Sequence, residues 1–156
     1  MLKWTRNYAE RRRRERVAHE AEVAALIDSG VVMQTTVSEK YASILSFEAS
    51  RAFLTRAERD AYLNTDVGAF MRPLGDLYAR GKPTGRGCYI ARFTTALTPD
   101  LNEHGTYTYH PGKIASTRLF LRALSRSGEH HTIQNIGRTL SLEEFATLLQ
   151  KVPTAN

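Results

Sequence analysis

Apolar residues recur at helical spacing in the N-terminal part of the chain. Steps of four, three and three positions separate Val17, Ala21, Ala24 and Ile27. This spacing places them on one face of an α-helix. Thr5 or Asn7 can cap the start of the helix, and Gly30 can end it in the left-handed conformation. The pattern predicts a first helix whose second half packs against the rest of the protein.

Residues 38–64 are predicted to form one long helix or two helices in series. Their apolar surface comes from Tyr41, Ile44, Leu45, Phe47, Ala52, Phe53 and Leu54. A capping-box pattern at Thr55 and Glu58 favours a fresh helix running to Leu63, because the threonine can accept from the amide three residues on while the glutamate reaches back. Another short helix, bent at its proline and glycine, is expected around residues 66–80.

The pattern changes at the glycine-rich turn of residues 81–87. Side chains alternate in character over 89–97 and 131–136, and threonine alternates with tyrosine over 106–109. Alternation with a period of two indicates strands, since successive side chains of a strand point to opposite faces. A second capping box, at Ser141, then opens a last helix.

Residues 116–127 fit two structures. As a strand, one face would interleave basic and apolar side chains, namely Arg118, Phe120, Arg122, Leu124 and Arg126. As a helix capped by Ser116 and ended at Gly128, the three arginines fall at positions i, i+4 and i+8. They share a face in both structures, and we refer to these three arginines as the basic strip.

Together these elements predict an α+β fold, with N-terminal helices and a basic first helix, then a small antiparallel sheet closed by a C-terminal helix. At 156 residues the chain is long enough to bury a core in one domain. We expect a basic helical arm at residues 1–16 and a single globular domain at 17–152. Within that domain, the helical part covers 17–80, the β-rich part 88–136 and the final helix 141–151.

Positive charge is unevenly distributed along the chain. The 22 Lys and Arg exceed the 16 Asp and Glu by six. Residues 1–16 carry seven bases and two acids, residues 17–71 four bases and eight acids, and residues 72–126 nine bases and three acids. Segregated positive charge favours nucleic acid, an anionic membrane surface or an acidic protein as a partner.

The N-terminal charge is concentrated in five arginines, which we name the arginine cluster: Arg11, Arg12, Arg13, Arg14 and Arg16. Successive helical residues are about 100° apart, so four consecutive arginines point in nearly every direction around the axis. This part of the helix has no apolar stripe to bury and is expected to stay in water. Planar guanidiniums make paired hydrogen bonds to oxyanions, which suits phosphate or carboxylate recognition. A solvated helix with internal ion pairs is the structural alternative.

Further candidate contacts lie in the C-terminal half. Lys82 and Arg86 add charge to the glycine-rich turn, which leaves a helical region and enters a strand, unlike the strand-to-helix order of a P-loop. The turn is interpreted as a basic turn or as a contact to a nucleic-acid backbone. Exposed rings could stack on bases, and the candidates are Tyr89, Tyr107, Tyr109 and Phe120. A core position is the alternative for each ring. Trp4 and Tyr8 could hold the arm to the body or to a partner.

The sequence points to no metal, cofactor or catalytic site. The histidines match no zinc-binding spacing, and the single cysteine, Cys88, excludes an internal disulfide. The lone thiol indicates a reducing, cytoplasmic setting. The longest apolar run of the first helix, residues 23–27, is too short to span a membrane, so no membrane partner is expected.

Charge segregation therefore favours a non-enzymatic protein that binds DNA or RNA, with the arginine cluster and the basic strip holding a phosphate backbone. The alternative is a small protein-binding module or inhibitor whose arginines dock on an acidic partner. The acidic stretch 17–71 also permits self-association, with the arm of one copy against another. An enzyme acting on a phosphorylated substrate is a third hypothesis.

Overall fold

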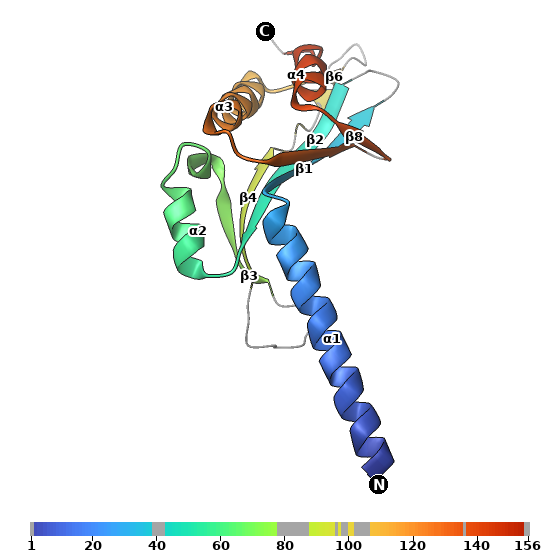
Figure 1. Ribbon diagram of the computed structural model, residues 1–156. Coiled ribbons are helices and arrows are strands. Elements are labelled where there is room, and N and C mark those ends of the chain that lie inside the picture. Colours follow the sequence, from blue (N-terminus) through green and yellow to red (C-terminus); the bar gives the residue numbers. More distant parts are fainter. Residues whose placement is uncertain are drawn as a thin grey trace.

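The computed structural model describes residues 2–38, 43–77, 88–95, 97, 100–101, 107–135 and 137–154. A long helix begins the chain, and strands and shorter helices then alternate (Figure 1). The elements in chain order are α1 (Leu2–Asp28), β1 (Val31–Ser38), β2 (Ser43–Phe53), α2 (Arg56–Leu63), the 3-10 helix η1 (Gly68–Phe70), β3 (Arg72–Leu77), β4 (Cys88–Thr95), β5 (Asp100–Leu101), β6 (Tyr107–Thr108), α3 (Pro111–Ser127), β7 (His131–Asn135), β8 (Arg138–Leu140) and α4 (Leu142–Gln150).

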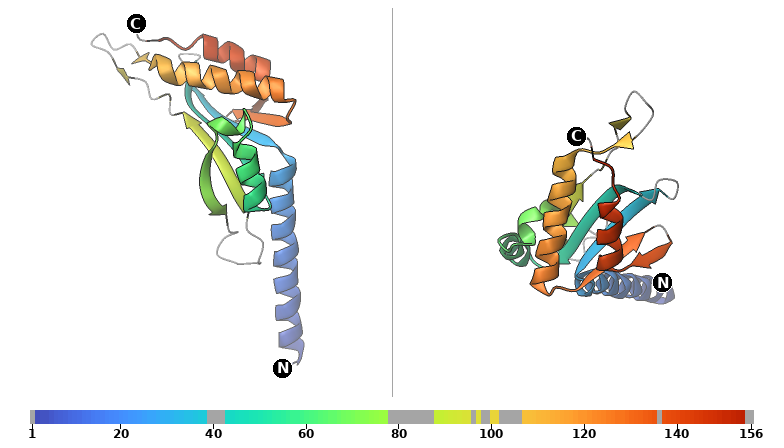
Figure 2. Two further views of the ribbon diagram at one scale, coloured as in Figure 1. Left: turned by 90° about the vertical axis from the view of Figure 1, so that its left-hand side faces the viewer. Right: turned by 90° about the horizontal axis from the view of Figure 1, so that it is seen from above.

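Among the described residues, six strands form one mixed sheet in the order β3-β4-β2-β1-β7-β8, and β5 pairs with β6 separately. The neighbours β1 and β7 run parallel, with Val31 opposite His131 and Thr35 opposite Asn135, whereas the other pairs are antiparallel. Helices α2, α3 and α4 cover one face of the sheet (Figures 1 and 2). The C-terminal half of α1 packs against the opposite face.

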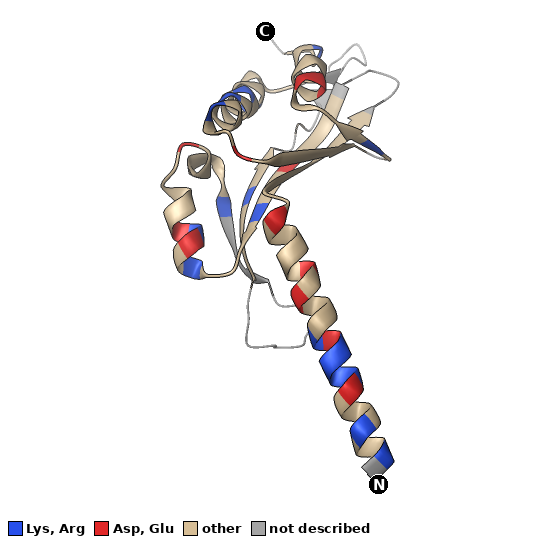
Figure 3. Ribbon diagram, in the orientation of Figure 1, with Lys and Arg blue, Asp and Glu red and all other residues tan. Residues whose placement is uncertain are grey.

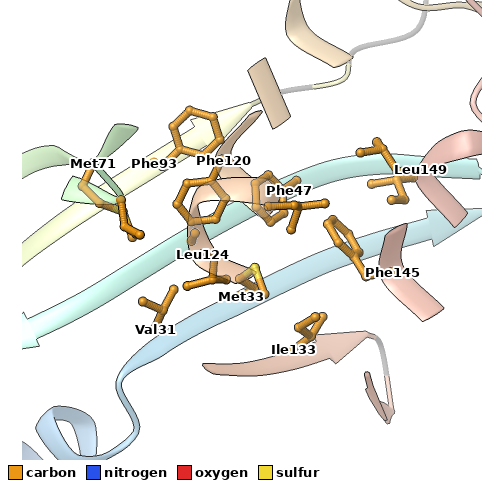
Figure 4. Packing of buried hydrophobic residues seen from close by; sticks show 14 of the residues in the cluster. Val31, Met33, Phe47, Met71, Phe93, Phe120, Leu124, Ile133, Phe145 and Leu149 are labelled. Carbon is orange, nitrogen blue, oxygen red and sulfur yellow. The ribbon is translucent and has the colours of Figure 1, made fainter. Parts of the chain in front are cut away.

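The main core lies between the sheet and these three helices, and aromatic rings from both layers meet in it (Figure 4). Phe93 of β4 and Phe120 of α3 stack with their ring centroids 5.1 Å apart. Phe47 of β2 contacts Phe145 of α4 at 5.2 Å. Burying large rings is among the strongest stabilising contributions in a core of this size. These contacts fix α3 and α4 on the sheet.

Several sequence predictions are confirmed. The α+β class, the long basic first helix and the C-terminal helix are all present. The α1 helix is followed by Gly30 in the left-handed conformation, with φ of 63°. The hydroxyls of Thr55 and Ser141 cap α2 and α4, each accepting from the amide three residues on, at 3.2 and 3.1 Å. Strands β4, β6 and β7 lie where alternation indicated. Residues 116–127 are helical, with His110 rather than Ser116 as the cap.

The helix predicted for residues 38–64 is wrong in its first half, which is strand β2. Strand β1, which precedes it, has no counterpart among the predicted elements. The short helix around 66–80 is also wrong, because η1 is followed there by strand β3 at the sheet edge, where a proline is tolerated. The sheet is larger than expected because β1, β2 and β3 belong to it. It contains a parallel pair because β1 also pairs with β7 from the C-terminal half of the chain.

Candidate nucleic-acid interface

Helix α1 extends well beyond the body of the protein (Figures 1 and 2). Its docking contacts come from the C-terminal half, where Val23 and Ile27 pack with Ala52, Cys88 and Ile90. Ala52 and its neighbour Phe53 are both buried because they face opposite sides of β2, one toward α1 and the other toward the main core. At 1.5 Å per residue, Arg11 lies about 18 Å along the axis from Val23. The N-terminal half of α1 is therefore a projecting arm.

The arginine cluster is exposed on this arm. Every residue from Lys3 to Arg14 is exposed, and so is Arg16. Basic residues follow one another around the helix rather than along one side (Figure 3). This arrangement agrees with the sequence expectation that four consecutive arginines leave no stripe to bury. The guanidiniums can be approached from many directions around the axis.

Two aromatic side chains share the arm with the arginine cluster. Trp4 is 75% exposed and Tyr8 is 45% exposed. Their rings are nearly parallel, at 13°, with centroids 6.0 Å apart. The guanidinium carbons of Arg11 and Arg12 lie 5.9 and 5.8 Å from the centroid of the Tyr8 ring. The sequence predicts these rings only as groups that hold the arm to the body or to a partner. Their spacing of four residues, followed by arginines three and four positions on, is the signal that places all four groups together.

The basic strip lies on α3, and its three arginines are exposed. The opposite side of the helix is buried in the core through Phe120, Leu121 and Leu124. In all views α3 sits on the sheet, whereas the arginine cluster lies toward the far end of α1 (Figures 2 and 3). The cluster and the strip are therefore separate basic surfaces, and the structure does not bring them together.

Two of the four candidate stacking rings, Tyr109 and Phe120, are buried in the core. Phe120 is fully buried and Tyr109 is 2% exposed, so the proposal that they stack on bases is wrong. In a helix, Phe120 points away from the arginines on either side of it. Tyr89 is half-buried, and the guanidinium carbons of Arg56 and Arg59 lie 5.7 and 5.5 Å from its ring centroid. The side chain of Tyr107 lies outside the described residues, as do Lys82 and Arg86.

One arginine of the body is held in a polar network. The Nη1 atom of Arg51 lies 2.9 Å from Oε1 of Glu129, and the Tyr62 hydroxyl donates to Oε2 of the same carboxylate at 3.0 Å. The guanidinium of Arg51 also stacks over the Tyr62 ring at 4.6 Å. Burial, together with the Glu129 charge, raises the pKa of Tyr62 above its ordinary value. Arg51 thus ties β2 to α2 and to the segment after α3, and it is engaged within the fold.

The change Glu129→Gln is expected to lower the free energy of unfolding by about 1 kcal/mol, because the amide keeps one acceptor for Tyr62 but loses the charge that holds Arg51. Thermal denaturation measures this as a decrease of about 2–4 °C in Tm. Glu144→Gln is a matched control, since the Arg138–Glu144 pair is far more exposed and glutamine preserves the capping box. An equal decrease in both variants would contradict a special role for the Glu129 network.

The described part of the chain contains no helix with both the length and the apolar run required to cross a bilayer. Nor do any three His, Cys, Asp or Glu side chains gather as a metal-binding group among the residues that the structure describes. No family model, curated protein or solved structure matches this chain. The geometry of the arm and of the basic strip is therefore what bears on function.

Proposed function

We propose that the protein binds nucleic acid without catalysing a reaction, and that the arginine cluster contacts the phosphate backbone. The observation that supports this is the exposure of the whole cluster on a projecting helix. A helix that is polar on all sides gains little from packing against its own protein. Such a segment is instead available to a partner, and its guanidiniums form charge-assisted hydrogen bonds with phosphate oxygens.

The density of charge on the arm favours a polyanion over a small anion. Residues 11–16 contain five arginines and one glutamate, a net charge of +4. They occupy about 9 Å of helix axis, or one net positive charge per roughly 2.2 Å. Duplex DNA carries about one negative charge per 1.7 Å of its axis. The two densities are similar, so a nucleic-acid backbone can neutralise the cluster as a whole.

The arrangement favours contacts to phosphate over recognition of base sequence. Arginines distributed around the axis do not present a single edge to a groove, and phosphate contacts position a protein without specifying a sequence. The basic strip adds a second surface on α3, with three arginines over about 12 Å. Because it lies away from the arm, it would reach a second strand or a distant part of a long nucleic acid.

Binding should depend steeply on salt. Fluorescence anisotropy with labelled DNA and RNA, both single-stranded and double-stranded, gives the affinity at each salt concentration. If four to five arginines each neutralise one phosphate, log Kobs should fall against log salt with a slope of about −4 for a duplex. Poly-glutamate of equal charge serves as the comparison polyanion. Absence of binding at low salt, or equally tight binding of poly-glutamate, would overturn the proposal and favour an acidic protein as partner.

A further inference from the structure

The Trp4–Tyr8 pair occupies the face of the arm that also carries two arginines of the cluster. At 100° per residue, Trp4, Tyr8, Arg11 and Arg12 fall within an arc of about 100° around the helix axis. The arginines lie over the Tyr8 ring, and Trp4 stacks beside it. The four side chains form a row of neighbouring planar groups, with Trp4 at one end, Tyr8 in the middle and the two guanidiniums at the other end.

Packing within the protein does not explain why two aromatic residues lie on the arm, because both are exposed. Trp4 has three quarters of its surface in solvent. The pair stabilises the helix only weakly, as is usual for side chains four residues apart. A tryptophan left so exposed on a highly charged segment marks a contact surface for a ligand with an aromatic or apolar face.

We propose that Trp4 and Tyr8 are a stacking platform that gives the arm a preference for single-stranded over double-stranded nucleic acid. The proposal rests on the proposed function, because the arginines must first hold the backbone. Unpaired bases expose flat faces that stack on aromatic rings, whereas the bases of a duplex are stacked on one another. The cation–π contacts hold Arg11 and Arg12 beside Tyr8. Both arginines are exposed, so the phosphates on either side of a stacked base can approach them.

The chemistry of this face fits a nucleic acid better than a membrane. A helix that lies on a bilayer buries a broad apolar face. Here the neighbours of the two rings are arginines, and the first half of α1 also carries Glu10 and Glu15. Aromatic rings combined with arginines are instead the usual elements of single-strand binding, where charge follows the backbone and rings hold the bases.

Trp4 is the single tryptophan of the chain, so its fluorescence reports directly on stacking. The protein is titrated with oligo-dT and with a hairpin duplex of equal phosphate number whose ends are closed by loops of non-nucleotide linker. We expect oligo-dT to quench the fluorescence and to bind about 5- to 150-fold more tightly for each stacked base. The hairpin should bind through the arginines with little quenching.

The double variant Trp4→Leu with Tyr8→Leu tests the role of the rings by anisotropy. Its affinity for oligo-dT should fall to that of the hairpin, while its affinity for the hairpin stays unchanged. Val17→Ala is the matched control. Although the sequence pattern predicts Val17 on the packing face, it is 59% exposed, and it lies on another side of the helix from the two rings.

The outcomes separate the two proposals. If wild type binds both ligands equally and the double variant changes neither affinity, the stacking platform is overturned while backbone binding stands. If neither ligand binds at low salt, the proposed function fails as well. Quenching or a blue shift with anionic vesicles but not with oligo-dT would overturn the stacking platform in favour of a membrane surface.

Discussion

Replacing Arg11, Arg12, Arg13 and Arg14 together by glutamine should lower the affinity for duplex DNA on the order of 10³-fold at 0.1 M salt. The electrostatic part of the affinity for four phosphate contacts varies with salt to the power of about −3.6, so removing them also reduces the salt slope by that amount. Glutamine is chosen because its helix propensity is close to that of arginine. Anisotropy across a salt series measures both quantities.

The basic strip supplies the matched control for that experiment. Glutamine at Arg118, Arg122 and Arg126 removes three exposed arginines of a helix packed on the sheet, and leaves α1 untouched. We expect a smaller loss of affinity, because these arginines lie apart from the arm. Far-UV circular dichroism should show equal helix content in both variants. Unchanged affinity in the four-arginine variant, or a greater loss from the strip variant, would contradict the arm as the principal site.

Local signals in the sequence were sufficient for the capped helices. Thr55 and Ser141 each hold the first turn of a helix through a hydrogen bond to a residue three positions away. Such contacts are complete within a few residues, and a sequence pattern captures them. The exposure of the arginine cluster was equally predictable, because four consecutive charges cannot share one buried stripe.

Strand β2 could not be predicted from its own residues, because its sequence lacks a regular alternation of buried and exposed side chains. The register shifts near Leu45, where β2 and β1 pair irregularly, and the adjacent residues Ala52 and Phe53 are both buried by layers on opposite faces. Both features remove the simple alternation that marks a strand. The parallel pairing of β1 with β7 joins residues about a hundred positions apart, and no local pattern encodes it.

In the candidate site, too, local features could be predicted from the sequence, whereas features that depend on the fold could not. Charge was located correctly because it depends on the identity and exposure of single residues. Three aromatic candidates come from predicted strands, and Phe120 comes from the segment that fits either a strand or a helix. Phe120 is wrong as a stacking ring because α3 turns it away from its arginine neighbours and into the core. The predicted caps, Thr5 and Asn7, start the first helix after Trp4, whereas α1 begins at Leu2. The pairing of Trp4 with Tyr8 follows from helical spacing only with this earlier start.

The burial of Phe120 leads to a second large effect. Phe120→Ala should lower the free energy of unfolding by about 3–5 kcal/mol, because it removes a fully buried ring and leaves a cavity among three other rings. The Phe120 ring centroid lies 5.1 Å from that of Phe93 and 5.9 Å from those of Phe47 and Phe70. For a chain of this length, Tm should fall by roughly 6–20 °C.

Leu119→Ala provides the control for this variant, since Leu119 precedes Phe120 on α3 but is 50% exposed, and its loss should change stability by no more than about 0.5 kcal/mol. Both variants should bind nucleic acid as wild type does when measured well below their Tm, because neither touches the arm. A Phe120→Ala protein of normal stability but reduced affinity for single strands would require the ring to face the ligand, and hence α3 to be turned over on the sheet. Measuring stability and affinity on the same preparation therefore separates a core ring from a stacking ring.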